Sequence, residues 1–198
     1  MKIIAAVVLG SLAIAQAAHG QQAAKPATAV TAAASASGSR NAAPDEFHQL
    51  LARAAGSWTG QATMTLSPTS PPLTSSSSLT NTMAMGGLFQ VSEIIYNING
   101  QRVHGVRVTG YDASKKVFTR AMIQDGGNGV AMEGPWDPAT KSTTMRYQQR
   151  NNATGQYADM KEVYTFLDAD TELLEIYRVD AKTNQEFKIL SVKWTRDR

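Results

Sequence analysis

The chain has 198 residues, of which 42% are hydrophobic and 18% charged, so it has room for one globular domain with appendages and not for two independent domains. All 16 acidic residues lie from Asp45 onward, whereas three of the 19 basic residues precede it. Residues 45–198 are therefore neutral and lack the basic footprint of a nucleic-acid-binding protein. The absence of cysteine excludes a disulfide framework and thiolate chemistry.

The first 44 residues predict an export signal followed by a tether. Lys2 precedes an apolar run from Ile3 to Ala15 and then small residues, which is typical of a secretory signal peptide over residues 1–20. Residues 21–44 are almost all Ala, Ser, Thr, Gly and Gln, and we expect them to form a disordered tether. The chain is therefore predicted to be a bacterial periplasmic or secreted protein, with no membrane span after signal removal.

Residues 45–56 predict a short amphipathic helix. Asp45 is a typical N-cap, and Gly56 is a typical stop signal. Between them, Phe47, Leu50, Leu51 and Ala54 recur at the spacing of one helical face, so we expect this face to pack on the following structure.

The remainder of the chain predicts ten antiparallel strands. Turn signals recur at intervals of roughly a dozen residues, and no long helical crossover separates them. The strongest is Asn99–Gly100, between two strand-like runs. The others are at 68–74, 86–87, 112–114, 125–129, 137–140, 151–155, 168–170 and 181–185. Because closing such a meander removes exposed edges, the predicted fold is an all-β, up-and-down antiparallel β-barrel of about ten strands, preceded by one helix.

Catalytic and metal-binding templates match the chain poorly. In Gly56-Ser57-Trp58-Thr59-Gly60 the serine stands one place early for a nucleophile elbow, and the segment runs from helix to strand instead of strand to helix. The acidic turn at 168–172 lacks the glycine and the final glutamate of a calcium loop. The three histidines, at 19, 48 and 104, have no zinc-site spacing. We therefore expect no metal, no cofactor and no enzymatic activity.

Charged residues in phase with apolar neighbours are the candidate ligand contacts. Glu93 is in phase with Val91 and Ile95, and Arg178 is in phase with Leu174 and Ile176. Glu162 shares its phase with Met160 and Tyr164, while Arg107 and Arg120 lie on strands whose alternation does not determine their side. Charges facing a barrel interior must pair, reach water or meet a ligand. Glu162 and Arg178 lie on neighbouring strands, so a mutual ion pair is an equally good interpretation.

The opening and closing segments resemble the calycin superfamily of lipocalins and their relatives. The match consists of a helix, then Gly56-x-Trp58 on the first strand, then a meander, then Arg196 at the end of the last strand. The resemblance implies a lipocalin-like barrel in which Gly56 and Trp58 lie at the closed end and Arg196 lies across the indole, a cation–π contact of about 0.5 to 2 kcal/mol. Ten strands are more similar to the fatty-acid-binding and nitrobindin-like branches.

More narrowly, residues 45–198 resemble a family of exported bacterial domains of unknown function. The motifs that carry the resemblance are Gly56-x-Trp58-x-Gly60, Gly86-Gly87-x-Phe89-x-x-x-Glu93, Gly105 to Gly110-Tyr111-Asp112, Glu133-Gly134, and Glu186-x-Lys188 to Thr195-Arg196. Nitrobindin-like proteins hold haem through a histidine near the chain end, and the segment ILSVKWTRDR contains none, so we expect no haem.

Three functions remain open from the sequence. The first is binding of a small, partly apolar or amphipathic ligand inside the barrel, with Glu93, Arg107, Arg120, Glu162 and Arg178 as polar contacts. The second is a structural or interaction module of the cell envelope. The third is an enzyme that uses Glu93 and Glu162, which would require both carboxyl groups to face one cavity.

Overall fold

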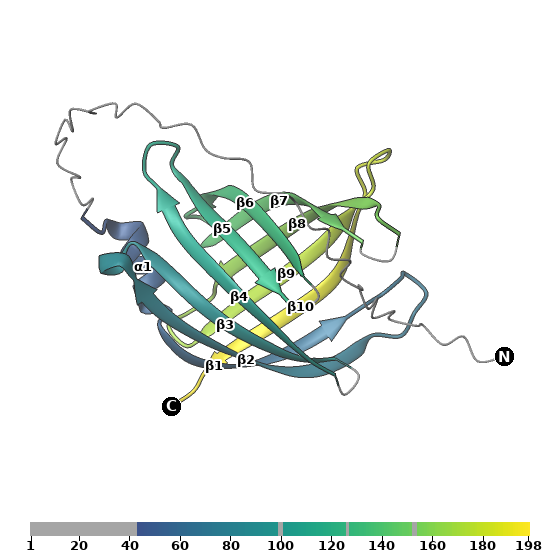
Figure 1. Ribbon diagram of the computed structural model, residues 1–198, viewed down its shortest axis with the longest axis horizontal. Coiled ribbons are helices and arrows are strands. Elements are labelled where there is room, and N and C mark those ends of the chain that lie inside the picture. Colours follow the sequence, from purple (N-terminus) through teal and green to yellow (C-terminus); the bar gives the residue numbers. More distant parts are fainter. Residues whose placement is uncertain (1–42, 99–100, 126, 152–153) are drawn as a thin grey trace, which may run out of the picture. The chain divides into compact units, whose positions relative to one another are not determined.

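The computed structural model describes residues 43–98, 101–125, 127–151 and 154–198, which form one helix and ten strands (Figure 1). The expected signal peptide, nearly all of the expected tether and the expected Asn99–Gly100 turn lie outside the described residues. The helix is α1 (Glu46–Arg53), and a short 3-10 turn, η1 (Met85–Gly87), separates the second and third strands. The strands are β1 (Gly56–Met64), β2 (Leu73–Ala84), β3 (Phe89–Ile98), β4 (Gln101–Asp112), β5 (Val117–Gln124), β6 (Asn128–Asp137), β7 (Ser142–Arg150), β8 (Tyr157–Phe166), β9 (Thr171–Val179) and β10 (Glu186–Arg196).

The strands form a closed up-and-down barrel, which confirms the predicted fold class. Every strand pairs antiparallel with its neighbours in sequence, and β1 closes the barrel by pairing with β10. In this closing ladder Trp58 is in register with Arg196, and Gly60 is in register with Trp194. A β-carbon at Gly60 would lie only 2.6 Å from the Trp194 ring, so only glycine permits this approach. We call the end of the barrel where β1 begins and α1 lies the helix end, and the opposite end the far end.

Asp45 is the N-cap of α1. Its Oδ1 accepts hydrogen bonds from the backbone N–H groups of Phe47, at 2.9 Å, and His48, at 3.2 Å. The ring Nδ1 of His48 in turn accepts from the Asp45 N–H at 3.1 Å, which completes a reciprocal capping box. Local hydrogen bonds between the cap residue and the first turn therefore stabilise the start of α1.

We expect Asp45→Ala to lower the free energy of unfolding by about 0.5 to 2 kcal/mol, because two helix N–H groups lose their acceptor. Urea unfolding followed by circular dichroism measures this loss. Gln49→Ala changes an exposed position of the same helix and should shift stability by less than about 0.5 kcal/mol. Equal effects of the two substitutions would show that the cap does not stabilise the helix.

Candidate functional site

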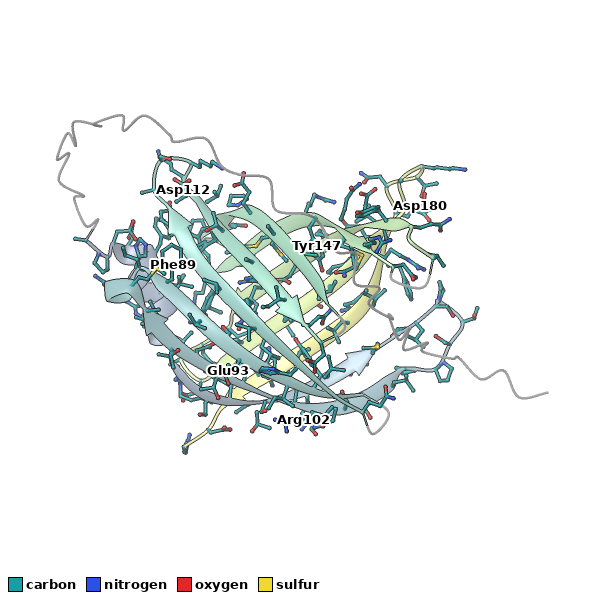
Figure 2. All side chains as sticks on the ribbon, in the orientation of Figure 1. Phe89, Glu93, Arg102, Asp112, Tyr147 and Asp180 are labelled. Carbon is teal, nitrogen blue, oxygen red and sulfur yellow. The ribbon has the colours of Figure 1, made fainter. Side chains whose placement is uncertain are left out.

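The inward face of β3 differs from the sequence prediction. Ser92 and Ile94 are fully buried inside the barrel, whereas Glu93 is exposed on the outer face of the strand (Figure 2). The expectation that Glu93 points into the interior is therefore wrong. The inward residues Gln90 and Ser92 are polar because they have hydrogen-bond partners far away in the sequence. Because these inward residues are not apolar, the sequence did not show which face of β3 points into the barrel. Gln90 Nε2 donates to the Leu51 carbonyl of α1 at 2.8 Å, and Ser92 contacts Arg107.

Arg178 has the inward phase of β9 but lies near the far end of the strand, where it is exposed. It forms no ion pair with Glu162, so the sequence interpretation that joined these two residues is wrong. Glu162 instead forms an ion pair with Arg120, from β5. The interior therefore brings together three of the five predicted contacts, Arg107, Arg120 and Glu162.

These three residues belong to a buried set that also includes Tyr164 and Glu172, and we call the five the polar layer. All of them are between 2% and 6% exposed. The Tyr164 hydroxyl donates to Glu172 Oε2, and Arg120 pairs with Glu162. The guanidinium carbons of Arg107 and Arg120 lie 5.0 and 5.1 Å from the centre of the Tyr164 ring, within cation–π range. The polar layer thus crosses the barrel interior as one connected network.

Burial shifts the pKa values of three residues of the polar layer, Arg120, Tyr164 and Glu172. Desolvation, and then the charge of Arg107, lower the pKa of Arg120 to about 9, so its guanidinium is still charged at neutral pH. Desolvation raises the pKa of Glu172, although the Tyr164 hydrogen bond and the nearby arginines oppose this rise. Desolvation also raises the pKa of Tyr164, so its hydroxyl remains a donor. The layer therefore buries two arginines together with two carboxyl groups.

Arg107 is the least satisfied member of the polar layer. Its only hydrogen bond among the described residues runs from Nη2 to Ser92 Oγ and is long, at 3.4 Å. Its buried Nε has no partner in the described part of the chain, and no described carboxylate forms an ion pair with it. Its guanidinium carbon lies 5.0 Å from the centre of the Tyr164 ring, and its charge opposes the rise that desolvation causes in the pKa of Glu172.

A cavity of about 160 Å³ lies on the far-end side of the polar layer. Its lining is mainly apolar, and Glu162 is the member of the polar layer that reaches it. Tyr96 and Tyr147 also line it, and neither phenol oxygen is hydrogen-bonded to a described residue. Desolvation raises the pKa of Tyr147 to about 12, so this phenol stays protonated at neutral pH. The full lining is Ala62, Met64, Ser75, Tyr96, Val103, Met122, Gln124, Gly129, Val130, Tyr147, Gln149, Glu162, Ile176 and Leu190.

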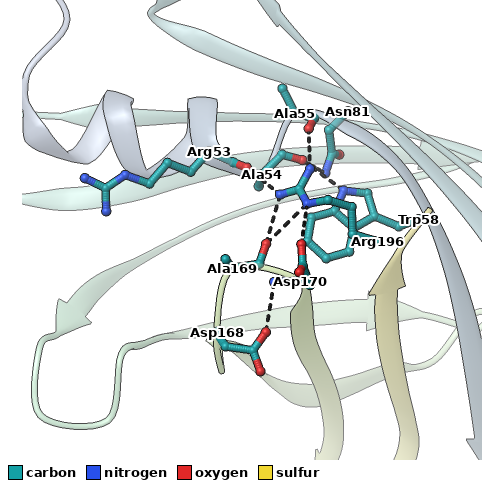
Figure 3. A network of polar contacts seen from close by, with 9 residues as sticks. All are labelled: Arg53, Ala54, Ala55, Trp58, Asn81, Asp168, Ala169, Asp170 and Arg196. Atoms are coloured by element: carbon teal, nitrogen blue, oxygen red, sulfur yellow. Dashed lines mark hydrogen bonds and ion pairs between the residues drawn. The ribbon is translucent and has the colours of Figure 1, made fainter. Parts of the chain in front are cut away.

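At the helix end, Arg196 joins the last strand to the helix. Its guanidinium lies over the Trp58 ring at 4.2 Å and donates to the carbonyls of Arg53, at 2.6 Å, and Ala55, at 2.7 Å (Figure 3). The Trp58 indole N–H donates to the Ala54 carbonyl at 3.0 Å. These side chains satisfy carbonyls that the end of a helix leaves without partners. Gly56, at φ +119°, starts β1 directly beside Arg196 in a backbone conformation that favours glycine.

The fold is a calycin-like barrel of ten strands, preceded in the described residues by one α-helix. The sequence profile of a family described as "Protein of unknown function (DUF1579)" matches residues 43–196, and the chain belongs to this family. The resemblance to a family of domains of unknown function is thereby confirmed. A search of curated proteins finds no match.

Solved structures to which this chain is similar in fold include two examples. The crystal structure of Rv2717c from M. tuberculosis is 14% identical and aligns with a TM-score of 0.56, covering 78% of this chain and 99% of that chain. The S-type phycobiliprotein lyase CPES from Guillardia theta is 10% identical and aligns with a TM-score of 0.53, covering 77% of this chain and 93% of that chain. At these identities the likeness concerns the fold alone.

Two features are absent from the described residues. None of their helices is long and apolar enough to cross a membrane. They also contain no group of three or more Asp, Glu or His side chains placed to hold a metal ion.

Sequence reasoning missed three residues of the interior, Tyr96, Tyr147 and Glu172, and it placed Tyr164 on the inward face without predicting its polar contacts. The alternation of β9 could have identified Glu172 as an inward residue, because it shares the phase of Leu174 and Ile176. The tyrosines carry no comparable signal, because an inward tyrosine on an alternating strand is ordinarily a core residue.

Proposed function

We propose that this protein is an exported, non-enzymatic barrel that binds a small, partly apolar molecule in the cavity on the far-end side of the polar layer. The observation that carries the proposal is the combination of a mainly apolar lining with a few polar groups, among them Glu162, Tyr96 and Tyr147. Small-molecule sites in proteins have this composition, with few polar groups that orient the ligand. Export to the periplasm or beyond is supported by the sequence of residues 1–20.

The volume of the cavity fits a ligand about the size of one aromatic ring. At about 160 Å³ it is close to the engineered cavities of about 150 Å³ that bind benzene, and smaller than most drug-sized sites. A molecule with a ring-sized apolar body and one hydrogen-bonding group would place the body against Met64, Val103 and Met122. A polar group that donates would form a hydrogen bond to Glu162, and one that accepts would receive a hydrogen bond from the hydroxyl group of Tyr96 or Tyr147.

Arg120 supports this role because it pairs with Glu162 inside the barrel. An isolated carboxylate at a cavity floor would be costly, whereas one paired with a buried guanidinium keeps free lone pairs for a ligand. An enzyme that uses Glu93 and Glu162 together is not supported, because these carboxyl groups lie on opposite faces of the barrel wall. The lyase neighbour shares only the fold, and no lyase activity is proposed.

Titration with phenol tests the proposal, because phenol has the expected size and one hydroxyl group. We expect saturable shifts of the Met64 and Met122 methyl signals in NMR spectra, because both side chains line the cavity. Ser75→Leu fills space in the lining and should weaken phenol binding by about tenfold or more.

Ser76→Leu is the matched control, because Ser76 is the next residue of β2 and is exposed on the outer face. It should leave the phenol affinity within about twofold. Binding that is equal in the two variants, or a wild-type protein whose methionine signals do not move, would contradict the proposed site.

A further inference from the structure

The helix end of the barrel holds a second and larger hollow, which we call the helix-end groove. Its volume is about 660 Å³, within the usual range of ligand sites. Helix α1 packs on β2, β3 and β4, so it covers one side of the barrel end and leaves the groove on the side of β6 to β9. The lining is Leu50, Arg53, Ala54, Trp136, Lys141, Phe166, Leu167, Asp168, Ala169, Asp170, Glu172 and Arg196.

Glu172 of the polar layer lines this groove and is only partly satisfied. It is 2% exposed, and its Oε2 accepts the Tyr164 hydroxyl. Its Oε1 has no hydrogen-bond partner among the described residues, and no described cation forms an ion pair with Glu172. Because Oε1 is not fully buried, it is open to the groove, and a ligand that supplies an N–H group can donate to it.

Two aromatic rings stand beside this carboxyl group. Trp136 and Phe166 are half-buried and meet edge to face, with ring centroids 5.8 Å apart. Leu50 and the exposed Leu167 extend the apolar lining. Aromatic faces attract organic cations and also accept apolar ligand bodies.

The other charges of the lining are already engaged or lie outside the buried part. Arg196 is held by backbone carbonyls and by Asp170 at 3.2 Å. The Asp168 carboxylate accepts the Asp170 N–H of its own turn at 2.8 Å, and Arg53 extends away from Arg196 (Figure 3). Lys141 is exposed. The buried end of the groove therefore presents one open acceptor, on Glu172.

We propose that the helix-end groove is a second binding site, separate from the far-end cavity, and that its ligand is a small organic ammonium ion. The ammonium N–H group donates to Glu172, and the aromatic or aliphatic body of the ligand lies against Trp136 and Phe166. A carboxylate ligand does not fit, because it has no N–H group to donate to Oε1 of Glu172.

Titration of the full chain with phenethylammonium tests this site. Among the three tryptophans only Trp136 lines the groove, whereas Trp58 and Trp194 are fully buried. We expect a saturable shift of the Trp136 indole N–H signal with phenethylammonium. We expect no saturable shift with 3-phenylpropionate, which has a similar body and the opposite charge.

Glu172→Gln removes the charge and keeps the shape, and should weaken phenethylammonium binding by about tenfold or more. Asp168→Asn is the matched control for an exposed carboxylate of the same lining, with an expected change of less than about twofold. Ala169→Phe narrows the groove from an exposed position, leaves the polar layer unchanged, and should weaken binding even if Glu172→Gln does not fold.

Ser75→Leu separates this inference from the proposed far-end site, because it fills the far-end cavity and should leave phenethylammonium binding unchanged. The inference is overturned if Ser75→Leu abolishes amine binding, if the Trp136 signal does not move, or if Ala169→Phe leaves the affinity unchanged. It is also overturned if folded Glu172→Gln binds phenethylammonium as tightly as the wild type.

Discussion

Glu162→Gln is expected to lower the free energy of unfolding by about 3 to 5 kcal/mol. The substitution removes the only ion-pair partner of Arg120 among the described residues and leaves its guanidinium buried beside Arg107. Both guanidinium groups contact the same Tyr164 ring, and no other described carboxylate forms an ion pair with either of them. Urea unfolding at neutral pH measures the loss, with a constant m value as the test of two-state behaviour.

The matched control is Glu93→Gln, the same chemical change on the exposed outer face of β3. It should alter stability by less than about 0.5 kcal/mol. The double variant Arg120→Met/Glu162→Leu should recover most of the loss, because an apolar pair of similar volume carries no desolvation cost. If the double variant loses as much stability as the Arg120→Met and Glu162→Leu single variants lose together, the pair does not act as a unit.

Trp58→Ala is the second substitution with a large expected effect, a loss of about 3 to 5 kcal/mol. Trp58 is 1% exposed and belongs to the core cluster that also contains Trp194 and Leu79. Its removal leaves a cavity, deprives the Ala54 carbonyl of the indole N–H, and removes the ring beneath Arg196. Thermal and urea unfolding both report this loss.

Trp58→Phe separates the contribution of packing from that of the indole hydrogen bond, because phenylalanine keeps most of the volume and lacks the N–H donor. We expect it to lower the free energy of unfolding by less than Trp58→Ala does. Trp136→Ala truncates a half-buried tryptophan and should also cost less than Trp58→Ala. Phenol affinity of folded Trp58→Ala should match the wild type, because Trp58 does not line the far-end cavity. A Trp58→Ala protein as stable as the wild type with weakened phenol binding would place Trp58 in the ligand site instead.

The barrel was predictable because its signals are local. Turn residues at regular intervals separate the strands, and the alternation of β1, with Trp58, Gly60 and Ala62 in one phase, matches the buried face in the structure. The cap residue Asp45 likewise acts within three positions of itself. Each of these features depends on neighbours in sequence, so one sequence is enough to find it.

The interior was less predictable because its contacts are distant in sequence. Arg120 and Glu162 lie on β5 and β8, which are not neighbouring strands, so no register argument could join them. The polar inner face of β3 depends on Gln90 contacting α1 and on Ser92 contacting Arg107. Without those partners, the apolar Val91 and Ile95 of the outer face suggested the opposite phase.

The central proposal is that the far-end cavity is a ligand site. A crystal structure from crystals grown in the presence of phenol tests it most directly. We predict that the phenol ring lies among Met64, Val103 and Met122, with its hydroxyl within hydrogen-bond distance of Glu162, Tyr96 or Tyr147. An empty far-end cavity in crystals that hold phenol elsewhere would contradict the proposal.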